Sequence, residues 1–393
     1  MRRGFCVWLA VLVASVAACE KKTPSAAPAP RAVPAEAASL EDDTVWLGEV
    51  GSLTGAQATF GISSRNGFDM AVREVNAAGG VKGRKLGLRV YDSQGRPEDA
   101  AQAATRLITR DKVVLILGEV SSTNSMAMAE KAQAAGVPMI SHAATHPGVT
   151  QKGDYIFRIC FIDPFQGFVM AKFAREQLAL REVAILQDNK SAYSIGLTDV
   201  FTRKFTEMGG KVVGTESYSK GDSDFRAQLT ALKKLKPQSL YIPGYYNDVG
   251  AIAQQAEELG LKTVLMGGDG WDGPPLFELG GRAIEGAYVS NHYSAEDPSP
   301  LVQNFIKKYQ ERYKVVPDSL AALGYDSARV GIEGMRRAKS LDGPDLREAI
   351  AATKDFPGVA GSITLNAKRD AEKPAVVLQV KDGKFKYVAT VNP

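Results

Sequence analysis

Two series of alternating strand and helix patterns most constrain the fold of this 393-residue chain. The first series, residues 44–141, contains the apolar run VVLILG (113–118), which is typical of a strand buried in a parallel sheet. The second series starts with VAILQD (183–188) and continues to about residue 293. Such alternation predicts parallel sheets with helices on both faces, and two series predict two Rossmann-like α/β lobes. Because ligands bind beyond the carboxyl ends of such strands, we expect the functional site in the cleft between the lobes.

The first 43 residues have the pattern of a targeting signal followed by a tether. Two arginines precede an uncharged run, residues 5–18, which is shorter than the about 20 residues of a membrane span and fits a signal peptide over residues 1–18. The run ends in VAAC, which resembles the lipobox of bacterial lipoproteins, in which Cys19 is lipidated. The alternative is an ordinary signal peptide with Cys19 incidental. Residues 19–43 are rich in Pro and Ala and predict an extended tether.

The composition excludes several classes of protein. A net charge of +4 argues against a nucleic-acid binder, and three cysteines are too few for a disulfide framework. Cys160 lies in an apolar run, which predicts a buried, inert thiol. The three histidines have no metal-ligand spacing, and the sequence has no P-loop, G-x-S-x-G or H-E-x-x-H motif. We therefore expect no enzyme, no metal and no cofactor.

One glycine-rich loop formally matches a dinucleotide fingerprint. The sequence GDGWDG (268–273) fits G-x-G-x-x-G after a strand. Asp269 and Asp272 would repel a phosphate, and two prolines follow. We therefore interpret this loop as one that presents Asp269 and Trp271 to the cleft.

Polar loops follow two strands of the first series. SSTNS (121–125) opens a helix, and hydroxyl and backbone N–H groups at a helix N-terminus suit an anion. The alternative is that these hydroxyls only cap the helix. The next strand ends in SHAAT (141–145), which should bring Thr145 beside that helix. Together the two loops predict a site for a carboxylate.

The second series ends its strands with aromatic and acidic side chains. Tyr193, Tyr245, Tyr246, Asp269 and Trp271 follow successive strands. An aromatic wall with one carboxylate suits a cation held among apolar groups. The two lobes together therefore predict a small zwitterion, with its carboxylate on the first lobe and its ammonium on the second.

These residues resemble the periplasmic leucine/isoleucine/valine-binding family of ABC-transporter solute receptors, the type I periplasmic binding proteins. The resemblance covers nearly all of residues 44–393. The matching stretches are GSLTGAQATFG, AVREVNAAGGVKGRKLGLRVYD, GVPMISHAATHP, FRICFIDPFQG, GYYNDVGAIAQQAEELGLK, GGDGWDGP and ALGYDSA.

The resemblance implies roles for individual residues. Ser122 matches the family's carboxylate-binding serine, and Ala143, through its backbone, and Thr145 match residues that hold the amino acid's carboxylate and amine. Asp269 falls where branched-chain amino-acid binders place an acidic residue against the ammonium, although Asp here is one methylene shorter than the usual Glu. The aromatic and bulky residues of the pocket would be Phe60, Tyr193, Tyr245 and Trp271.

The resemblance also implies three crossings between the lobes, which form a three-strand hinge. We place these crossings near residues 160–164, 288–293 and 358–362. The N-terminal lobe would then be residues 44–160 plus 292–358, and the C-terminal lobe residues 163–289 plus 360–393.

The function implied is that of an extracytoplasmic substrate-binding component of an ABC importer. It would capture a branched-chain or other hydrophobic amino acid by hinge closure and deliver it to permease subunits with cytoplasmic ATPases. We expect a monomer, anchored by its lipid in the periplasm or at the cell surface. Two alternatives remain: a sensor for a signalling partner, or a receptor for an amide or an aromatic acid.

Overall fold

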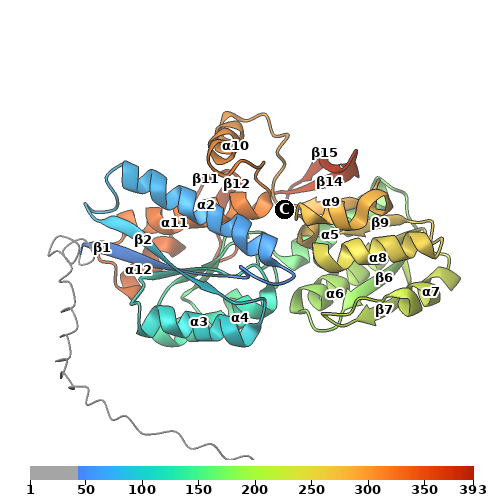
Figure 1. Ribbon diagram of the computed structural model, residues 1–393, viewed down its shortest axis with the longest axis horizontal. Helices are drawn as coiled ribbons and strands as arrows, with labels where there is room; N and C mark the ends of the chain where they lie inside the picture. Colours follow the sequence, from blue (N-terminus) through green and yellow to red (C-terminus); the bar gives the residue numbers. More distant parts are fainter. Residues whose placement is uncertain (1–42) are drawn as a thin grey trace, which may run out of the picture. The chain divides into compact units, whose positions relative to one another are not determined.

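The structure, a computed structural model, describes residues 43–393 (Figure 1). The predicted signal peptide, the predicted lipidation site Cys19 and nearly all of the tether lie outside the described residues. Among the described residues, no helix has the length and apolar character needed to cross a membrane.

A five-stranded parallel sheet forms the centre of the first lobe, in the order β2-β1-β3-β4-β5. Its strands are β1 (Thr44–Gly51), β2 (Lys85–Asp92), β3 (Leu115–Gly118), β4 (Met139–Ser141) and β5 (Ile156–Arg158). Every residue of β3 is buried, as its unbroken apolar sequence predicts. The predicted buried strand of this lobe is therefore confirmed.

Helices cover both faces of this sheet (Figure 1). The helices and the 3₁₀ turn of this lobe are α2 (Ala58–Ala77), α3 (Pro97–Thr109), α4 (Ser122–Ala135), η1 (Thr150–Lys152), α10 (Pro300–Tyr313), α11 (Ser319–Arg337) and α12 (Gly343–Ala351). Helices α2 and α11 pack closely because glycines face each other: a Cβ on Gly67 would lie 2.2 Å from the carbonyl oxygen of Ala321. Residues far apart in the sequence thus complete the first lobe.

A seven-stranded mixed sheet forms the centre of the second lobe, in the order β15-β14-β10-β9-β8-β6-β7. Its strands are β6 (Glu182–Asp188), β7 (Lys211–Tyr218), β8 (Ser239–Ile242), β9 (Val264–Gly267), β10 (Tyr288–Asn291), β14 (Ala375–Lys381) and β15 (Lys384–Val391). Its helices are α5 (Asp163–Glu176), α6 (Ala192–Glu207), α7 (Arg226–Lys234), α8 (Tyr246–Glu258), η2 (Asp269–Trp271), α9 (Pro275–Gly280) and η3 (Gly281–Ile284). Strands β6 to β10 are parallel, and β14 and β15 form an antiparallel hairpin at one edge. The predicted α/β fold with two lobes is confirmed.

The chain passes between the lobes three times: from β5 to α5, from β10 to α10, and from a small sheet to β14. That small sheet consists of β11 (Phe356–Gly358), β12 (Gly361–Leu365) and β13 (Ala371–Glu372). Cys160, in the first crossing, is a buried free thiol, as predicted. The body has one main hydrophobic core that includes residues of both lobes, and Phe161 of the first crossing belongs to it.

The lobe boundaries stay a prediction, but the small sheet favours a different third boundary. Leu365 N donates to Thr353 O at 3.0 Å, and Asp370 pairs with Arg158 of β5. Both partners belong to the first lobe, whereas we expected residues 360–393 in the second. We therefore propose that the third crossing lies at residues 373–374, not near 358–362.

Candidate ligand-binding site

A cavity lies between the two lobes, where the strands of both sheets end. It is lined by Phe60, Val120, Ser122, Ala143, Thr145 and Leu320 from the first lobe, and by Tyr193, Tyr245, Asp269 and Gly270 from the second. The cavity left between these side chains has a volume of only about 10 Å³. The lobes therefore lie close together here, and an amino acid can reach the cavity only if they separate.

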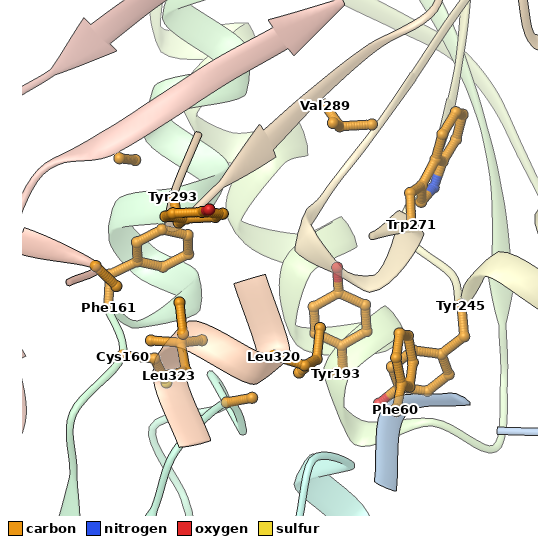
Figure 2. Close-up of a cluster of buried hydrophobic side chains, with 14 of the residues drawn as sticks. Phe60, Cys160, Phe161, Tyr193, Tyr245, Trp271, Val289, Tyr293, Leu320 and Leu323 are labelled. Atoms are coloured by element: carbon orange, nitrogen blue, oxygen red, sulfur yellow. The ribbon is translucent and has the colours of Figure 1, made fainter. Parts of the chain in front are cut away.

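The cavity brings together all the predicted contact residues except Trp271. The indole of Trp271 is fully buried, and its Nε1 donates to Ile242 O at 2.9 Å. Figure 2 shows this side chain directed away from Phe60, Tyr193 and Tyr245. The predicted ligand contact of Trp271 therefore has no support in this geometry.

The local structure explains why Asp269 and Trp271 separate. Both lie on η2, a single 3₁₀ turn, in which residues two apart point in different directions. In an extended strand end they would have shared a face. The sequence signal placed both residues in a loop but could not distinguish these two geometries.

The N-terminus of α4 forms the polar end of the cavity on the first lobe. Ser121 occupies the N-cap position, but its side chain accepts no hydrogen bond from the helix, so the alternative that these hydroxyls only cap the helix is not supported. Ser122 Oγ accepts a hydrogen bond from His146 N at 3.3 Å, which joins this helix to the loop of Ala143 and Thr145. The uncapped first turn and the Ser122 hydroxyl together suit an anion.

A buried glutamate that sequence reasoning missed holds this helix start in place. Glu119 is fully buried and accepts hydrogen bonds from Ser93 Oγ (2.6 Å), Ser52 Oγ (2.7 Å) and Ser121 N (2.8 Å). Three donors satisfy its carboxylate, so it positions the loop and does not line the cavity. The only signal in the sequence was an acidic residue directly after an apolar strand.

Arg158 holds the second polar loop, which contains Ala143 and Thr145, in place. Its Nη1 donates to Ala144 O (2.7 Å) and His146 O (2.8 Å), the carbonyl groups on either side of Thr145. Its Nε and Nη2 donate to Asp370 Oδ1 at 2.9 and 2.7 Å, and Nη2 also donates to Thr150 Oγ1 at 3.1 Å. Arg158 is fully buried, so this side chain uses its hydrogen-bonding capacity to hold the loop of Thr145.

Asp269 provides the charged end of the cavity on the second lobe. Its Oδ1 accepts hydrogen bonds from Gln166 Nε2 (2.7 Å) and Tyr193 OH (3.0 Å), and its Oδ2 lies 2.9 Å from His292 Nε2. Burial lowers the pKa of His292 although Asp269 raises it, so the imidazole stays neutral near pH 7. The negative charge of Asp269 is therefore left for a ligand. Sequence reasoning missed both Gln166 and His292.

Aromatic rings from both lobes form the apolar wall (Figure 2). Phe60 of α2 meets the edge of Tyr245 with ring centroids 5.8 Å apart, and Tyr193 stacks on Tyr245 at 5.3 Å. Leu320, at the start of α11, adds an aliphatic surface that sequence reasoning missed. The cavity therefore pairs an anion site and a carboxylate with an apolar surface between them.

Two α/β lobes that enclose such a cavity and are joined by three crossings define a binding protein that closes on a small ligand. The family model for the periplasmic binding proteins matches residues 44–384, and the chain belongs to this family. Membership implies a periplasmic location and a substrate-binding role.

Relatives of known name support the same family. The chain is 31% identical to the leucine-, isoleucine-, valine-, threonine- and alanine-binding protein of Pseudomonas aeruginosa, over 84% of this chain and 88% of that protein. It is similar to the crystal structure of a leucine-binding protein from Thermotoga maritima (38% identity, TM-score 0.86, 89% and 99% coverage). It is also similar to a branched-chain amino-acid substrate-binding protein from Streptococcus pneumoniae in complex with isoleucine (31% identity, TM-score 0.85, 89% and 100% coverage).

Proposed function

We propose that this protein is the substrate-binding component of an ABC importer and captures a branched-chain or other hydrophobic amino acid. One observation carries the proposal. Asp269 on the second lobe and the uncapped N-terminus of α4 on the first line the same cavity, with aromatic rings beside them. The names of the relatives from three bacteria support the same class of ligand.

Each residue of the proposed site has a physical task. The first turn of α4, with Ser122, Ala143 and Thr145, would bind the ligand's carboxylate through N–H and O–H donors. Asp269 would accept hydrogen bonds from the ammonium, and closure would exclude water from both charged ends. Phe60, Tyr193, Tyr245 and Leu320 would contact the apolar side chain.

Calorimetric titration with a matched set of ligands tests this proposal. L-Leucine is compared with 4-methylpentanoate, which lacks the ammonium, and with 3-methylbutylamine, which lacks the carboxylate. Loss of either charged group should weaken binding by about 10- to 100-fold, because hydrogen bonds to charged groups contribute about 1.5–3 kcal/mol each. Equal affinity for leucine and 4-methylpentanoate would exclude a zwitterion site.

The same titration separates the alternatives. A receptor for an aromatic acid should bind benzoate more tightly than leucine, although the uncompensated charge of Asp269 opposes this. A receptor for an amide should prefer isobutyramide. Mass spectrometry that recovers the ligand unchanged would exclude turnover.

We further propose delivery to a permease and attachment to the membrane through lipidated Cys19. Genes for permease and ATPase subunits beside this one would support transport, whereas a neighbouring kinase gene would favour the sensor alternative. Labelling with a fatty-acid analogue should mark the protein and should fail for Cys19→Ser. Light scattering should give the mass of a monomer.

A further inference from the structure

A second cavity lies beside the hinge and shares no lining residue with the first. Its volume is about 370 Å³. Asp318 and the two residues before it line it from the first lobe, and Asp272, Phe277 and Phe385 line it from the second. Residues 293–296 of the second crossing complete the wall. A molecule bound here would touch both lobes and the hinge.

Two carboxylates, one from each lobe, face this cavity. Asp272 Oδ2 accepts hydrogen bonds from Asn291 Nδ2 (2.8 Å) and Ser319 N (2.9 Å). Asp318 Oδ1 accepts one from Ala321 N (2.9 Å), and its Oδ2 accepts one from Ser63 Oγ (2.6 Å). Burial and the charge of Asp272 raise the pKa of Asp318 above its ordinary value. These neighbouring negative charges disfavour each other, and a cation between them would relieve that repulsion.

The other charged groups at the cavity offset little of the negative charge of Asp272 and Asp318. Glu296 also lines the wall, but Lys386 Nζ lies 2.8 Å from its Oε1 and offsets its charge. Lys384 lines the cavity as an exposed residue at the start of β15. The buried part of the cavity therefore keeps a negative character from Asp272 and Asp318.

Tyr293 provides an independent indication of a ligand. Its side chain is 95% buried, since only 5% is exposed, and its hydroxyl has no hydrogen-bond partner within residues 43–393. Tyr293 lines the cavity together with Asp272 and Asp318, and burial and the charges of Asp272, Asp318 and Asp297 raise the pKa of its hydroxyl. Buried hydroxyl groups are normally paired, and a group bound in this cavity would pair this one.

The remaining wall is apolar and aromatic. Phe277 and Phe385 meet edge to face with ring centroids 5.0 Å apart. Val316, which also lines the cavity, is 54% exposed at its rim. Aromatic faces next to carboxylates suit an ammonium that carries an apolar tail.

We propose that this hinge-side cavity binds a small organic cation, a primary ammonium with an aromatic or aliphatic tail. The ammonium donates to Asp272, Asp318 and the Tyr293 hydroxyl oxygen, and the tail packs on Phe277 and Phe385. Because both lobes line the cavity, its occupation is coupled to closure of the lobes. The coupling rests on the proposed function, whereas the site itself does not.

Titration calorimetry with 2-phenylethylamine tests the site. The protein is first saturated with leucine, so that the cavity of Asp269 is occupied, and 3-phenylpropanoate serves as the matched anion. We expect the amine to bind and the anion not to bind. Asp318→Asn should weaken amine binding by about tenfold or more, and Tyr293→Phe by about 2- to 10-fold.

Tyr288→Phe is the matched control. Tyr288 lies on β10, directly before the second crossing, but its hydroxyl accepts a hydrogen bond from Gln379 Nε2 at 2.9 Å. This variant should leave amine binding unchanged. Amine affinity that is equal in the wild type, Tyr293→Phe and Asp318→Asn overturns the proposal, as does the absence of amine binding. If Asp318→Asn does not fold, Tyr293→Phe against Tyr288→Phe still decides.

Two further titrations separate this site from the first one. Amine binding without leucine that Tyr293→Phe weakens reports the hinge-side site even if leucine does not bind, so failure of the proposed function is visible separately. If leucine binds and displaces the amine, both share one cavity and the hinge-side site is excluded. Saturation with the amine should raise leucine affinity, and an unchanged leucine affinity would overturn the coupling.

Discussion

The first-lobe end of the candidate site consists mainly of backbone and hydroxyl groups, whereas the second-lobe end depends on one charged side chain. On the first lobe, the start of α4 and the loop of Thr145 are held by the buried Glu119 and Arg158. On the second lobe, Asp269 is itself the polar group that would meet the ligand. A single substitution should therefore remove the second end, but only weaken the first.

The largest loss of affinity is expected for Asp269→Asn. This change removes the charge and keeps the size of the side chain, so leucine affinity should fall by about 10- to 100-fold. Calorimetry measures the effect. Trp271→Phe is the control two residues away: it should lower the melting temperature but leave leucine affinity unchanged, because the indole does not reach the cavity. Unchanged affinity in Asp269→Asn would remove this residue from the site.

Asp370→Asn tests whether ligand binding at the first-lobe end of the site depends on the buried pair of Arg158 and Asp370. The change leaves the guanidinium of Arg158 buried without its charge partner, which should lower the free energy of unfolding by about 3–5 kcal/mol. It should also weaken leucine binding, because Arg158 holds the carbonyl groups beside Thr145. Denaturant melts and calorimetry measure the two effects.

The matched control is Asp154→Asn, which breaks the exposed pair with Arg347. Surface pairs contribute about 0–1 kcal/mol, so neither stability nor affinity should change much. Full leucine affinity in a folded but destabilised Asp370→Asn would show that the pair supports the fold and not the site.

A smaller effect is expected for Ser122→Ala. The backbone N–H groups of α4 remain, so leucine affinity should fall by only about 2- to 10-fold, as for one hydrogen bond. A loss as large as that of Asp269→Asn would contradict the contrast between the two ends, because it would make one hydroxyl as important as the carboxylate.

The last prediction concerns stability and not affinity, and it compares two buried glutamates of the first lobe. Glu119 has three hydrogen-bond donors, whereas neither carboxylate oxygen of the equally buried Glu49 has a partner among the described residues. Burial raises the pKa of Glu49 to about 8. The folded state therefore keeps its proton while the unfolded chain loses it, and this contribution to stability falls as pH rises from about 4.5 to 8.

Glu49→Gln should remove that contribution. Between pH 5 and pH 8, the melting temperature of the variant should fall less than that of the wild type. Equal pH dependence of the two proteins would mean that Glu49 is ionised in the folded state.

The sequence predicted the residues at strand ends better than the residues that support them. Apolar runs located β3 and β6, and the rule that ligands bind at the carboxyl ends of strands then identified Ser122, Thr145, Tyr193 and Asp269 as neighbours. These residues follow directly from local patterns. The direction of the Trp271 side chain could not be predicted in this way, because it depends on the 3₁₀ turn of η2.

The supporting residues were missed because their partners lie far away in the sequence. Arg158 and Asp370 are 212 residues apart, and Gln166 and Asp269 are 103 residues apart. No spacing rule connects such pairs, and each side chain alone is equally compatible with an exposed position. The contacts of Asp370 that favour a different third crossing are also long-range, so the sequence could not indicate them.

Because Cys160 is buried, closure of the lobes can be measured with dyes attached to cysteines introduced elsewhere. Burial raises the pKa of this thiol, so among residues 43–393 the wild type offers no accessible cysteine to a thiol-reactive dye. Ile62 on α2 and Ile195 on α6 are 49% and 39% exposed, one on each lobe and each within two residues of a ring that lines the cavity. Fluorophores attached through cysteines at these two positions would report the separation of the lobes as an optical signal, molecule by molecule.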